Sequence, residues 1–304
     1  MIRYILLSVF MIFGSSLETA ADDFNKGVKA FQNSDYVTAL RLWKPIADNG
    51  EPVAQHNLGI LYEYGFGVSQ DYEAAVQWYT RSTEQGYANA QTALGGKYNR
   101  GVGVEKNYKN AFYWYQLAAE QNDAIAEHNL GVFYENGFFV SINYPTAMKW
   151  YSRSATKGYD PAQLAIGSMY ASGLGVSKNY KEAIEWYRFS ANQGNSNAQH
   201  NLGDMYYNGT GVDQNYKTAF DWFTLAAKQG NAQSQGNLSV MYALGQGFVK
   251  SYIYAYMWGD IAIYNGNKIS EILRDQVKEN MNSSQIERAQ NLSQKCIRQN
   301  YKNC

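Results

Sequence analysis

The chain has 304 residues, with 26 lysines and arginines balanced by 26 aspartates and glutamates. The only charged residues in positions 1–21 are Arg3 and Glu18, so a chain without this segment would also have a formal net charge of zero. A neutral chain lacks the basic footprint that phosphate binding needs, so nucleic acid is excluded as the main partner.

The first 21 residues are typical of a secretory signal peptide. Arg3 supplies a positive start, Tyr4 to Phe13 form an apolar run, and Thr19-Ala20-Ala21 place small residues ahead of Asp22. The run is much shorter than the roughly 20 residues that a membrane-spanning helix needs. We therefore expect cleavage before Asp22, no membrane insertion afterwards, and a periplasmic or secreted protein.

Residues 22–50 form a short copy of a unit that recurs later in the chain. Tyr36, Ala39 and Gly50 keep the register of the later copies. Gly27 stands nine residues before its tyrosine, where the full copies have thirteen. We expect a short N-terminal helix pair here.

Residues 51–266 repeat with a period of 36. One tryptophan marks each copy, at Trp78, Trp114, Trp150, Trp186, Trp222 and Trp258. Self-similarity at a period of 20–50 residues is the signature of stacked helical arrays, so we expect an all-α fold of about six full helix pairs. The register is unbroken, which predicts no domain boundary, and we expect each tryptophan to be a core residue of its helix pair.

A single copy can be interpreted physically. The apolar residues around Leu58 fall at helical spacing, and Gly65 ends this first helix because glycine readily adopts positive φ. Asp71 is a good N-cap for a second helix, which Gly86 stops. Gly59 lies inside the first helix, where glycine costs about 1 kcal/mol, so we expect it to let a neighbouring helix approach closely.

Residues 267–304 read as two further helices that cap the array, since terminal units must cover the exposed end of the core. Cys296 and Cys304 lie there and are the chain's two cysteines. In an exported protein such a pair favours a disulfide, and two free thiols are the alternative.

The repeated stretches resemble the Sel1-like repeat, a relative of the tetratricopeptide repeat. The resemblance rests on Ala54-Gln55-His56-Asn57-Leu58-Gly59, on Tyr170 to Val176, and on Ala183-Ile184-Glu185-Trp186-Tyr187. It implies a right-handed α/α solenoid that acts as an adaptor or scaffold, with the short first copy closer to an ordinary tetratricopeptide unit. Bacterial members are often exported, and some are linked to signalling, envelope regulation or contact with host proteins.

By analogy with tetratricopeptide packing, one face of the first helices lines a concave groove. The expected partner-binding residues are His56, Ile60, Tyr64, Thr92, Arg100, His128, Val132, Asn136, His200, Asp204, Tyr207 and Asn208. They mix apolar, polar and charged groups of both signs, which suits a protein or peptide better than a polyanion. Neighbouring histidines lie two copies apart, which is too far for them to bind the same metal ion, so we expect no metal site. We also expect no cofactor, and we expect the protein to be a monomer.

An enzyme is the alternative interpretation. Ser154 to Lys157 matches the Ser-x-x-Lys string of penicillin-binding enzymes, and one cysteine-rich branch of the resembling family has been associated with penicillin binding. This chain lacks the cysteines of that branch and has no accompanying Lys-Thr-Gly. The sequence therefore favours a non-enzymatic scaffold, with a cell-wall-active or β-lactam-binding or -hydrolysing enzyme as the alternative.

Overall fold

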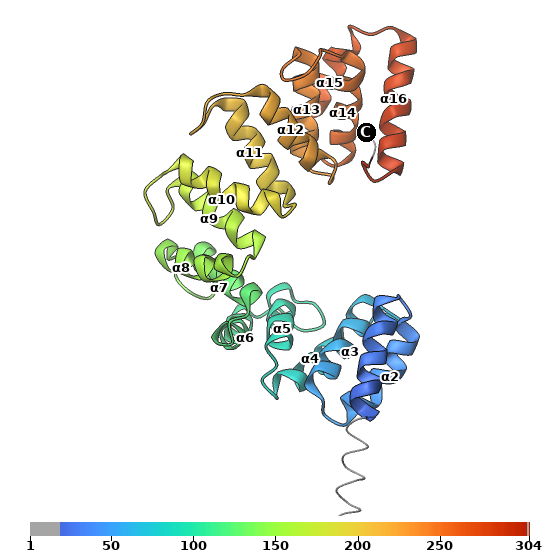
Figure 1. The fold of residues 1–304 in the computed structure, drawn as a ribbon, viewed down its shortest axis with the longest axis vertical. Helices are drawn as coiled ribbons and strands as arrows, with labels where there is room; N and C mark the ends of the chain where they lie inside the picture. The colour runs from blue at the N-terminus through green and yellow to red at the C-terminus, as the bar shows by residue number, and fades with distance from the viewer. Residues whose placement is uncertain (1–18, 303) are drawn as a thin grey trace, which may run out of the picture. The chain divides into compact units, whose positions relative to one another are not determined.

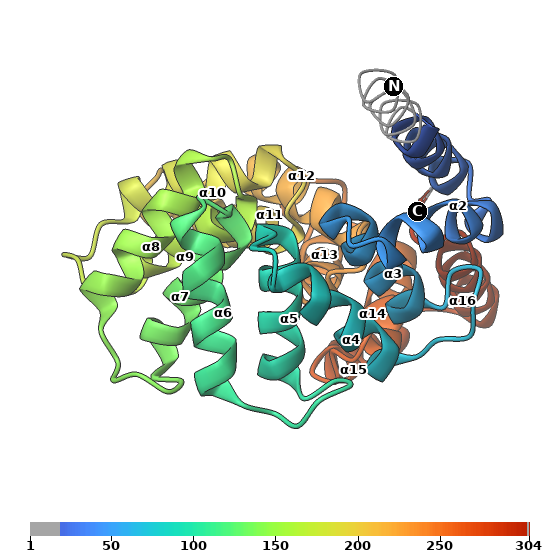
Figure 2. The ribbon, with the colours of Figure 1, turned by 90° about the horizontal axis from the view of Figure 1, so that it is seen from below.

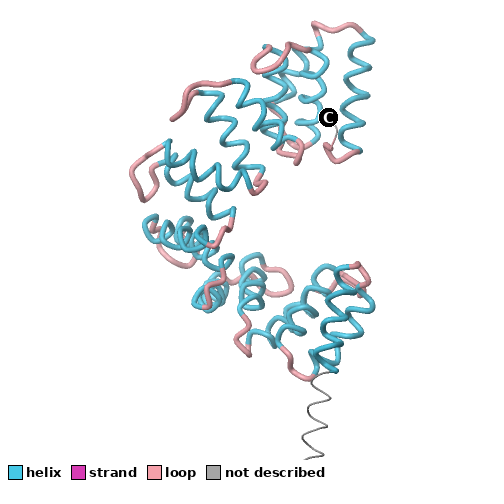
Figure 3. Tube along the Cα trace, in the orientation of Figure 1, coloured by secondary structure: helices cyan, strands magenta, loops and turns pink. Residues whose placement is uncertain are grey.

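The computed structural model describes residues 19–302 and Cys304, and nearly all of the expected signal peptide lies outside them. The described residues form helices joined by turns, with no strand among them (Figure 3). They cluster into two compact units, the first ending at Asn143 and the second beginning at Tyr144. The unbroken 36-residue register does not predict this division.

Each unit is a stack of antiparallel helix pairs, coloured along the chain in Figure 1. The first unit contains a helix over residues 19–32, then α2 (Tyr36–Asp48), α3 (Pro52–Tyr64), α4 (Tyr72–Thr83), α5 (Ala88–Arg100), α6 (Tyr108–Glu120) and α7 (Ala124–Asn136). The second contains α8 (Tyr144–Thr156), α9 (Asp160–Ser172), α10 (Tyr180–Asn192), α11 (Ser196–Asn208), α12 (Tyr216–Ala227), α13 (Ala232–Leu244), α14 (Tyr252–Tyr264), α15 (Ser270–Lys278) and α16 (Ser283–Arg298).

Within each unit a helix packs against the helices before and after it, as Figure 2 shows for α5, α6 and α7. We call the first helix of each full copy an A helix and the second a B helix. The A helices are α3, α5 and α7 in the first unit and α9, α11 and α13 in the second. No helix in the described part of the chain is long and apolar enough to cross a membrane.

The expected helix signals are confirmed. Gly65 has φ 69° and donates its N–H to the carbonyl of Leu61, which ends α3 in the left-handed conformation that glycine favours. The side chain of Asp71 accepts a hydrogen bond from the Ala74 N–H and starts α4. These two residues reverse the chain between an A helix and its B helix.

The tryptophan ladder is less buried than expected. Trp78 and Trp258 are buried, but Trp114, Trp150, Trp186 and Trp222 are only half-buried, so the expectation of six core tryptophans is wrong for four of them. The deep core is instead formed by the next residue along each B helix. That column contains Tyr79, Tyr115, Tyr151, Tyr187 and Phe223, all of them buried.

These buried rings lie against the glycines of the A helices. A methyl group on Gly59 would come within 2.4 Å of the Tyr79 ring, and one on Gly203 within 2.5 Å of the Phe223 ring. Real Cβ atoms do not approach so closely. The prediction that these glycines allow a close helix approach is therefore confirmed, and the group that approaches is the aromatic ring.

A ladder of buried glutamines joins consecutive copies and was not expected from the sequence. Gln199 on α11 donates to the carbonyl of Ala191, which belongs to the preceding B helix, at 3.1 Å. Its own amide oxygen accepts from Gln229 at 2.8 Å. Related pairs recur at Gln55, Gln91, Gln163 and Gln235. Four of these glutamines donate to a carbonyl near the end of the preceding helix, which fixes how one copy sits on the next: Gln55, Gln163, Gln199 and Gln235.

The last copy inverts the pairing of glycine and aromatic ring. Ser239 stands at the glycine position and Gly259 at the ring position. The Ser239 hydroxyl donates to the Ala255 carbonyl at 2.6 Å. A Cβ on Gly259 would lie 3.2 Å from Cβ of Arg274 on α15, so the capping helix fills the space that a ring occupies in other copies.

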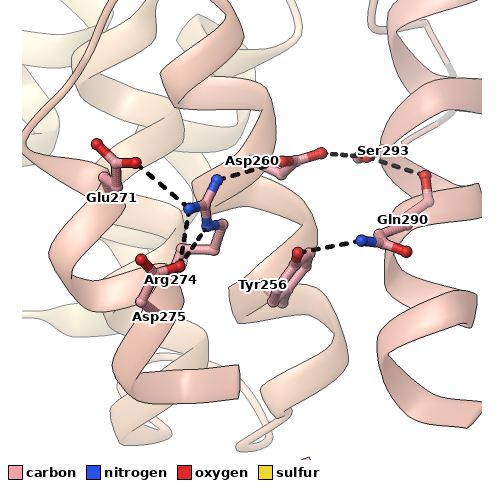
Figure 4. Close-up of polar contacts among 7 residues, drawn as sticks. All are labelled: Tyr256, Asp260, Glu271, Arg274, Asp275, Gln290 and Ser293. Carbon is pink, nitrogen blue, oxygen red and sulfur yellow. Dashed lines mark hydrogen bonds and ion pairs between the residues drawn. The ribbon is translucent and has the colours of Figure 1, made fainter. Parts of the chain in front are cut away.

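Polar contacts and a disulfide hold the C-terminal cap, as expected for residues 267–304. Arg274 pairs with Asp275 at 2.7 Å and with Asp260 at 3.8 Å, and the Ser293 hydroxyl on α16 donates to Asp260 at 2.6 Å (Figure 4). Cys296 and Cys304 form the predicted disulfide, which leaves no free cysteine among the described residues.

Candidate partner-binding surface

The A helices of the first unit enclose a cavity of about 350 Å³. Five of the predicted partner-binding residues line it: His56, Ile60, Tyr64, Thr92 and Arg100. They come from α3 and α5 because the repeat places the same face of each A helix in the same direction. The structure thus brings these five residues together around one cavity.

Glu63 lines this cavity and belongs to a buried ion pair. The Lys97 ammonium is 2.5 Å from one carboxylate oxygen of Glu63, and Lys97 is only 1% exposed. The Tyr79 hydroxyl donates to the other oxygen at 2.8 Å. Burial, and then the neighbouring Glu63 carboxylate, raise the pKa of Tyr79, so its hydroxyl stays protonated and acts as a donor.

Lys97 and Glu63 were not among the predicted site residues. The signal for Lys97 is present in the sequence, because it replaces an apolar residue in a column that is otherwise Leu61, Phe133, Met169, Met205 and Met241. A lysine in an apolar column needs a buried partner. The column does not say where that partner lies, and only the packing of α5 on α3 places Glu63 against it.

His56 is half-buried between two tyrosine rings, with centroids 5.6 Å from Tyr79 and 5.3 Å from Tyr87. Burial lowers its pKa, while Asn57 and the Glu63 carboxylate act in the opposite direction. Its Nδ1 atom and the hydroxyl of Thr92 are both buried without a hydrogen-bond partner in the described part of the chain. Both residues line the cavity, although these two polar atoms are themselves buried.

The predicted residues on α7 lie outside this cavity. Asn136 donates to the carbonyl of Val132 in its own helix at 2.9 Å, and neither residue lines the cavity, nor does His128. Ile125 and Asn129 of the same helix line it instead. Sequence reasoning missed these two because the analogy with tetratricopeptide packing selected other repeat columns, those of His128, Val132 and Asn136.

The second unit has a larger cavity, of about 790 Å³. His200 and Asp204 of α11 line it together with α13, the loop that follows α14, and the start of α15. His200 bonds the Ser234 hydroxyl through Nδ1 at 2.9 Å and approaches Asp204 through Nε2 at 3.2 Å. The predicted His200 and Asp204 are therefore brought together, and the missed lining residues include Gln233, Asn237, Lys268 and Ile269.

The other predicted residues of α11 are split between two environments. Asn208 lines a smaller cavity of about 240 Å³ beside Asp204. Tyr207 lines neither cavity, because its ring packs on Tyr216 at 5.3 Å and its hydroxyl donates to Gln246 at 2.9 Å. The volumes of the two larger cavities fall in the range of small-molecule or peptide pockets.

Neither serine that could suggest catalysis is accessible. Ser154, the first residue of the Ser-x-x-Lys string, is fully buried, as are Ser82 and Ser190 at the same repeat position. Ser234 bonds His200, which approaches Asp204, but its hydroxyl is also fully buried. Within residues 19–302 and Cys304, no three His, Cys, Asp or Glu side chains are grouped to hold a metal.

The fold and this surface define a class of protein: an array of tandem helix pairs whose A helices present non-repeating side chains. The Sel1 repeat model matches six consecutive segments, at residues 52–87, 88–123, 124–159, 160–195, 196–231 and 232–267. The chain therefore belongs to the Sel1 repeat family.

Two solved structures illustrate the likeness. A Sel1 repeat protein from Oxalobacter formigenes is 35% identical, with a TM-score of 0.73, and the match covers 79% of this chain and 96% of that one. The Escherichia coli protein c5321, described as a protective antigen present in uropathogenic strains, is 25% identical, with a TM-score of 0.51, over 94% of this chain and 86% of that one. No curated protein matches the chain.

Proposed function

We propose that this protein is a non-enzymatic scaffold that binds a protein or peptide partner along the A-helix face of its units. Sel1 repeat proteins are typically scaffolds for protein interactions. The observation that carries the proposal is the distribution of the non-repeating residues. Columns that recur every 36 residues fill the core, whereas Tyr64 and Arg100 occupy a column that varies between copies and line a cavity. Lys268 follows the last copy and lines the cavity of the second unit.

A substitution series tests where the partner binds. The mature protein with Tyr64→Ala, Arg100→Ala and Lys268→Ala is compared with wild type by affinity capture and mass spectrometry. A matched control carries Tyr113→Ala, Lys109→Ala and Lys181→Ala, which are exposed positions on B helices. We expect the first variant to lose a captured protein that wild type and control retain. Equal capture by all three would contradict the proposal.

We further propose that the protein works outside the cytoplasm, in the periplasm or beyond. Residues 1–21 have the pattern of a cleaved signal, and the Cys296–Cys304 disulfide suits an oxidising compartment. N-terminal sequencing of the protein from fractionated cells tests this. We expect a mature chain that begins at Asp22 in the periplasm or medium, and an intact Met1 in the cytoplasmic fraction would count against export.

A further inference from the structure

The cavity of the first unit contains a cation that no described side chain neutralises. Arg100 is exposed at the end of α5 and has no carboxylate within ion-pair distance in the described part of the chain. Its guanidinium folds back over its own helix, because a Cβ built on Gly96 would lie 3.4 Å from Nη1 and 3.6 Å from Nη2. The charge therefore lies in the cavity beside Gly96.

Gly96 is what makes room for this arrangement. The equivalent residues in the other copies all carry side chains: Ile60, Val132, Ser168, Asp204 and Val240. A glycine inside a helix costs about 1 kcal/mol against alanine, so a glycine in one copy alone calls for a local reason. The guanidinium occupies the space that those side chains would take.

The lining of the cavity leaves no free carboxylate to pair with Arg100. Glu63 is the one acidic residue in its lining, and Lys97 together with the Tyr79 hydroxyl already engages both of its carboxylate oxygens. Burial disfavours the charged form of His56. Arg100 is left as the uncompensated charge, and it attracts an anionic group.

Hydrogen-bonding groups around Arg100 match a carboxylate. Thr92 has a buried hydroxyl without a partner, and the amides of Asn99 and Asn129 line the same cavity. A carboxylate offers about four acceptor sites and pairs with a guanidinium through two parallel bonds. A single carboxylate could therefore accept from Arg100 and from the amide of Asn99 or Asn129 at once.

The flanks of the cavity indicate where the carboxylate comes from. Tyr64 on α3 is 58% exposed and Ile125 on α7 is 44% exposed, so apolar surface lies on both sides of α5. A partner chain that continues in both directions would cover these two side chains. A free chain end would cover only one of them.

We propose that the cavity of the first unit is a receptor for the side-chain carboxylate of an aspartate or glutamate within an extended segment of the protein partner. This inference rests on the proposed scaffold function, because it names the chemistry that one part of the A-helix face recognises. Arg100 provides the charge, Gly96 makes room for it, and the amides of Asn99 and Asn129 supply further hydrogen-bond donors.

Selection from a random peptide library tests the inference. The library is displayed as an internal loop, so that no peptide has a free carboxyl end, and is selected on the full mature chain. We expect the enriched sequences to share an aspartate or glutamate. For a selected peptide, changing that residue to its amide should weaken the Kd by about tenfold or more, the scale of a hydrogen bond to a charged group.

Variants of the protein test the same contact from the other side. Arg100→Gln should weaken binding about as much as the amide peptide does, and combining the two changes should cost little more, since both remove the same contact. Gly96→Val should have a similar effect by displacing the guanidinium. Arg81→Gln, an exposed arginine on the B helix α4, should leave the Kd unchanged to within about twofold.

The outcomes separate this inference from the scaffold proposal. Peptides that bind without an acidic residue, or that ignore Arg100→Gln, would overturn the carboxylate receptor and leave the scaffold function standing. A selection in which no peptide binds the wild-type chain would contradict both.

Discussion

At the scale of single residues, the fold depends on a contact between a glycine and a ring that repeats along the chain. Gly59 and Gly203 leave no room for a methyl group beside Tyr79 and Phe223. The sequence indicates that these glycines allow a close approach. It does not indicate that the ring next to the tryptophan is the group that approaches, because two neighbouring aromatic columns share the same period and only packing separates them.

Two glycine substitutions in A helices should therefore have opposite effects on stability. Gly59→Ala places Cβ 2.4 Å from a buried ring and should lower the free energy of unfolding by about 1–3 kcal/mol, as overpacking does. Gly96→Ala meets the flexible end of Arg100 at 3.4 Å and the Tyr115 hydroxyl at an ordinary contact distance of 3.7 Å, and it should raise the free energy of unfolding by up to about 1 kcal/mol. Urea unfolding of both variants measures the difference, and an equal loss in both would refute this explanation.

The half-buried His56 should make stability depend on pH. The pKa of His56 in the folded chain lies below its ordinary value of 6.5. At pH values between these two pKa values, the imidazole is mostly protonated in the unfolded chain and mostly neutral in the folded chain. Above pH 6.5 the imidazole is neutral in both states, and no penalty exists. As pH falls below 6.5 the penalty grows, and the free energy of unfolding decreases.

The variant His56→Thr isolates this effect, since the next copy has Thr92 at the same position. Between pH 7 and pH 5 wild type should lose more stability than the variant, as followed by chemical unfolding at a series of pH values. Parallel curves for the two proteins would show that His56 titrates alike in both states.

At the scale of helices, local signals could be read from the sequence and long-range pairs could not. Gly65 and Asp71 mark a helix end and a helix start through their own backbone preferences. The pairing of Lys97 with Glu63 depends on the packing of α5 against α3, which no local pattern encodes. The residues that line the cavities were predicted where they lie on A helices, as for His56 and Arg100, and missed in the loop that follows the last copy, as at Lys268.

The inverted pair in the last copy should behave as a coupled unit. Gly259→Tyr restores the ring of the other copies but meets Ser239 and Arg274, so it should destabilise the protein by about 1–3 kcal/mol. Adding Ser239→Gly opens space for the ring and should recover part of that loss. Thermal and urea unfolding of both variants test this, and a double variant no more stable than Gly259→Tyr alone would argue against coupling.

At the scale of the whole molecule, the 36-residue period is the unit of construction. Deleting residues 160–195 removes one copy from the second unit and joins equivalent positions, so the chain should remain helical and unfold cooperatively with reduced stability. Deleting only residues 160–177 breaks the register and should abolish cooperative unfolding. Circular dichroism of the two proteins measures this, and similar behaviour of both would contradict a modular array.

At this scale, function depends on whether the A-helix face or the B-helix face binds the partner. Core columns repeat because each copy packs on the next in the same way, and they hold no information about specificity. The non-repeating A-helix residues are free to differ between copies. The central claim is that this face, and not the B-helix face, contacts a protein.

Site-specific photocrosslinking in the protein's own cell envelope tests that claim most directly. A photoreactive phenylalanine replaces Tyr64 on the A helix α3 or Tyr113 on the B helix α6, which are 58% and 52% exposed. We expect a covalent adduct with a partner protein from position 64 and none from position 113. Comparable adducts from both positions, or adducts from position 113 alone, would contradict the assignment of the A-helix face as the binding surface.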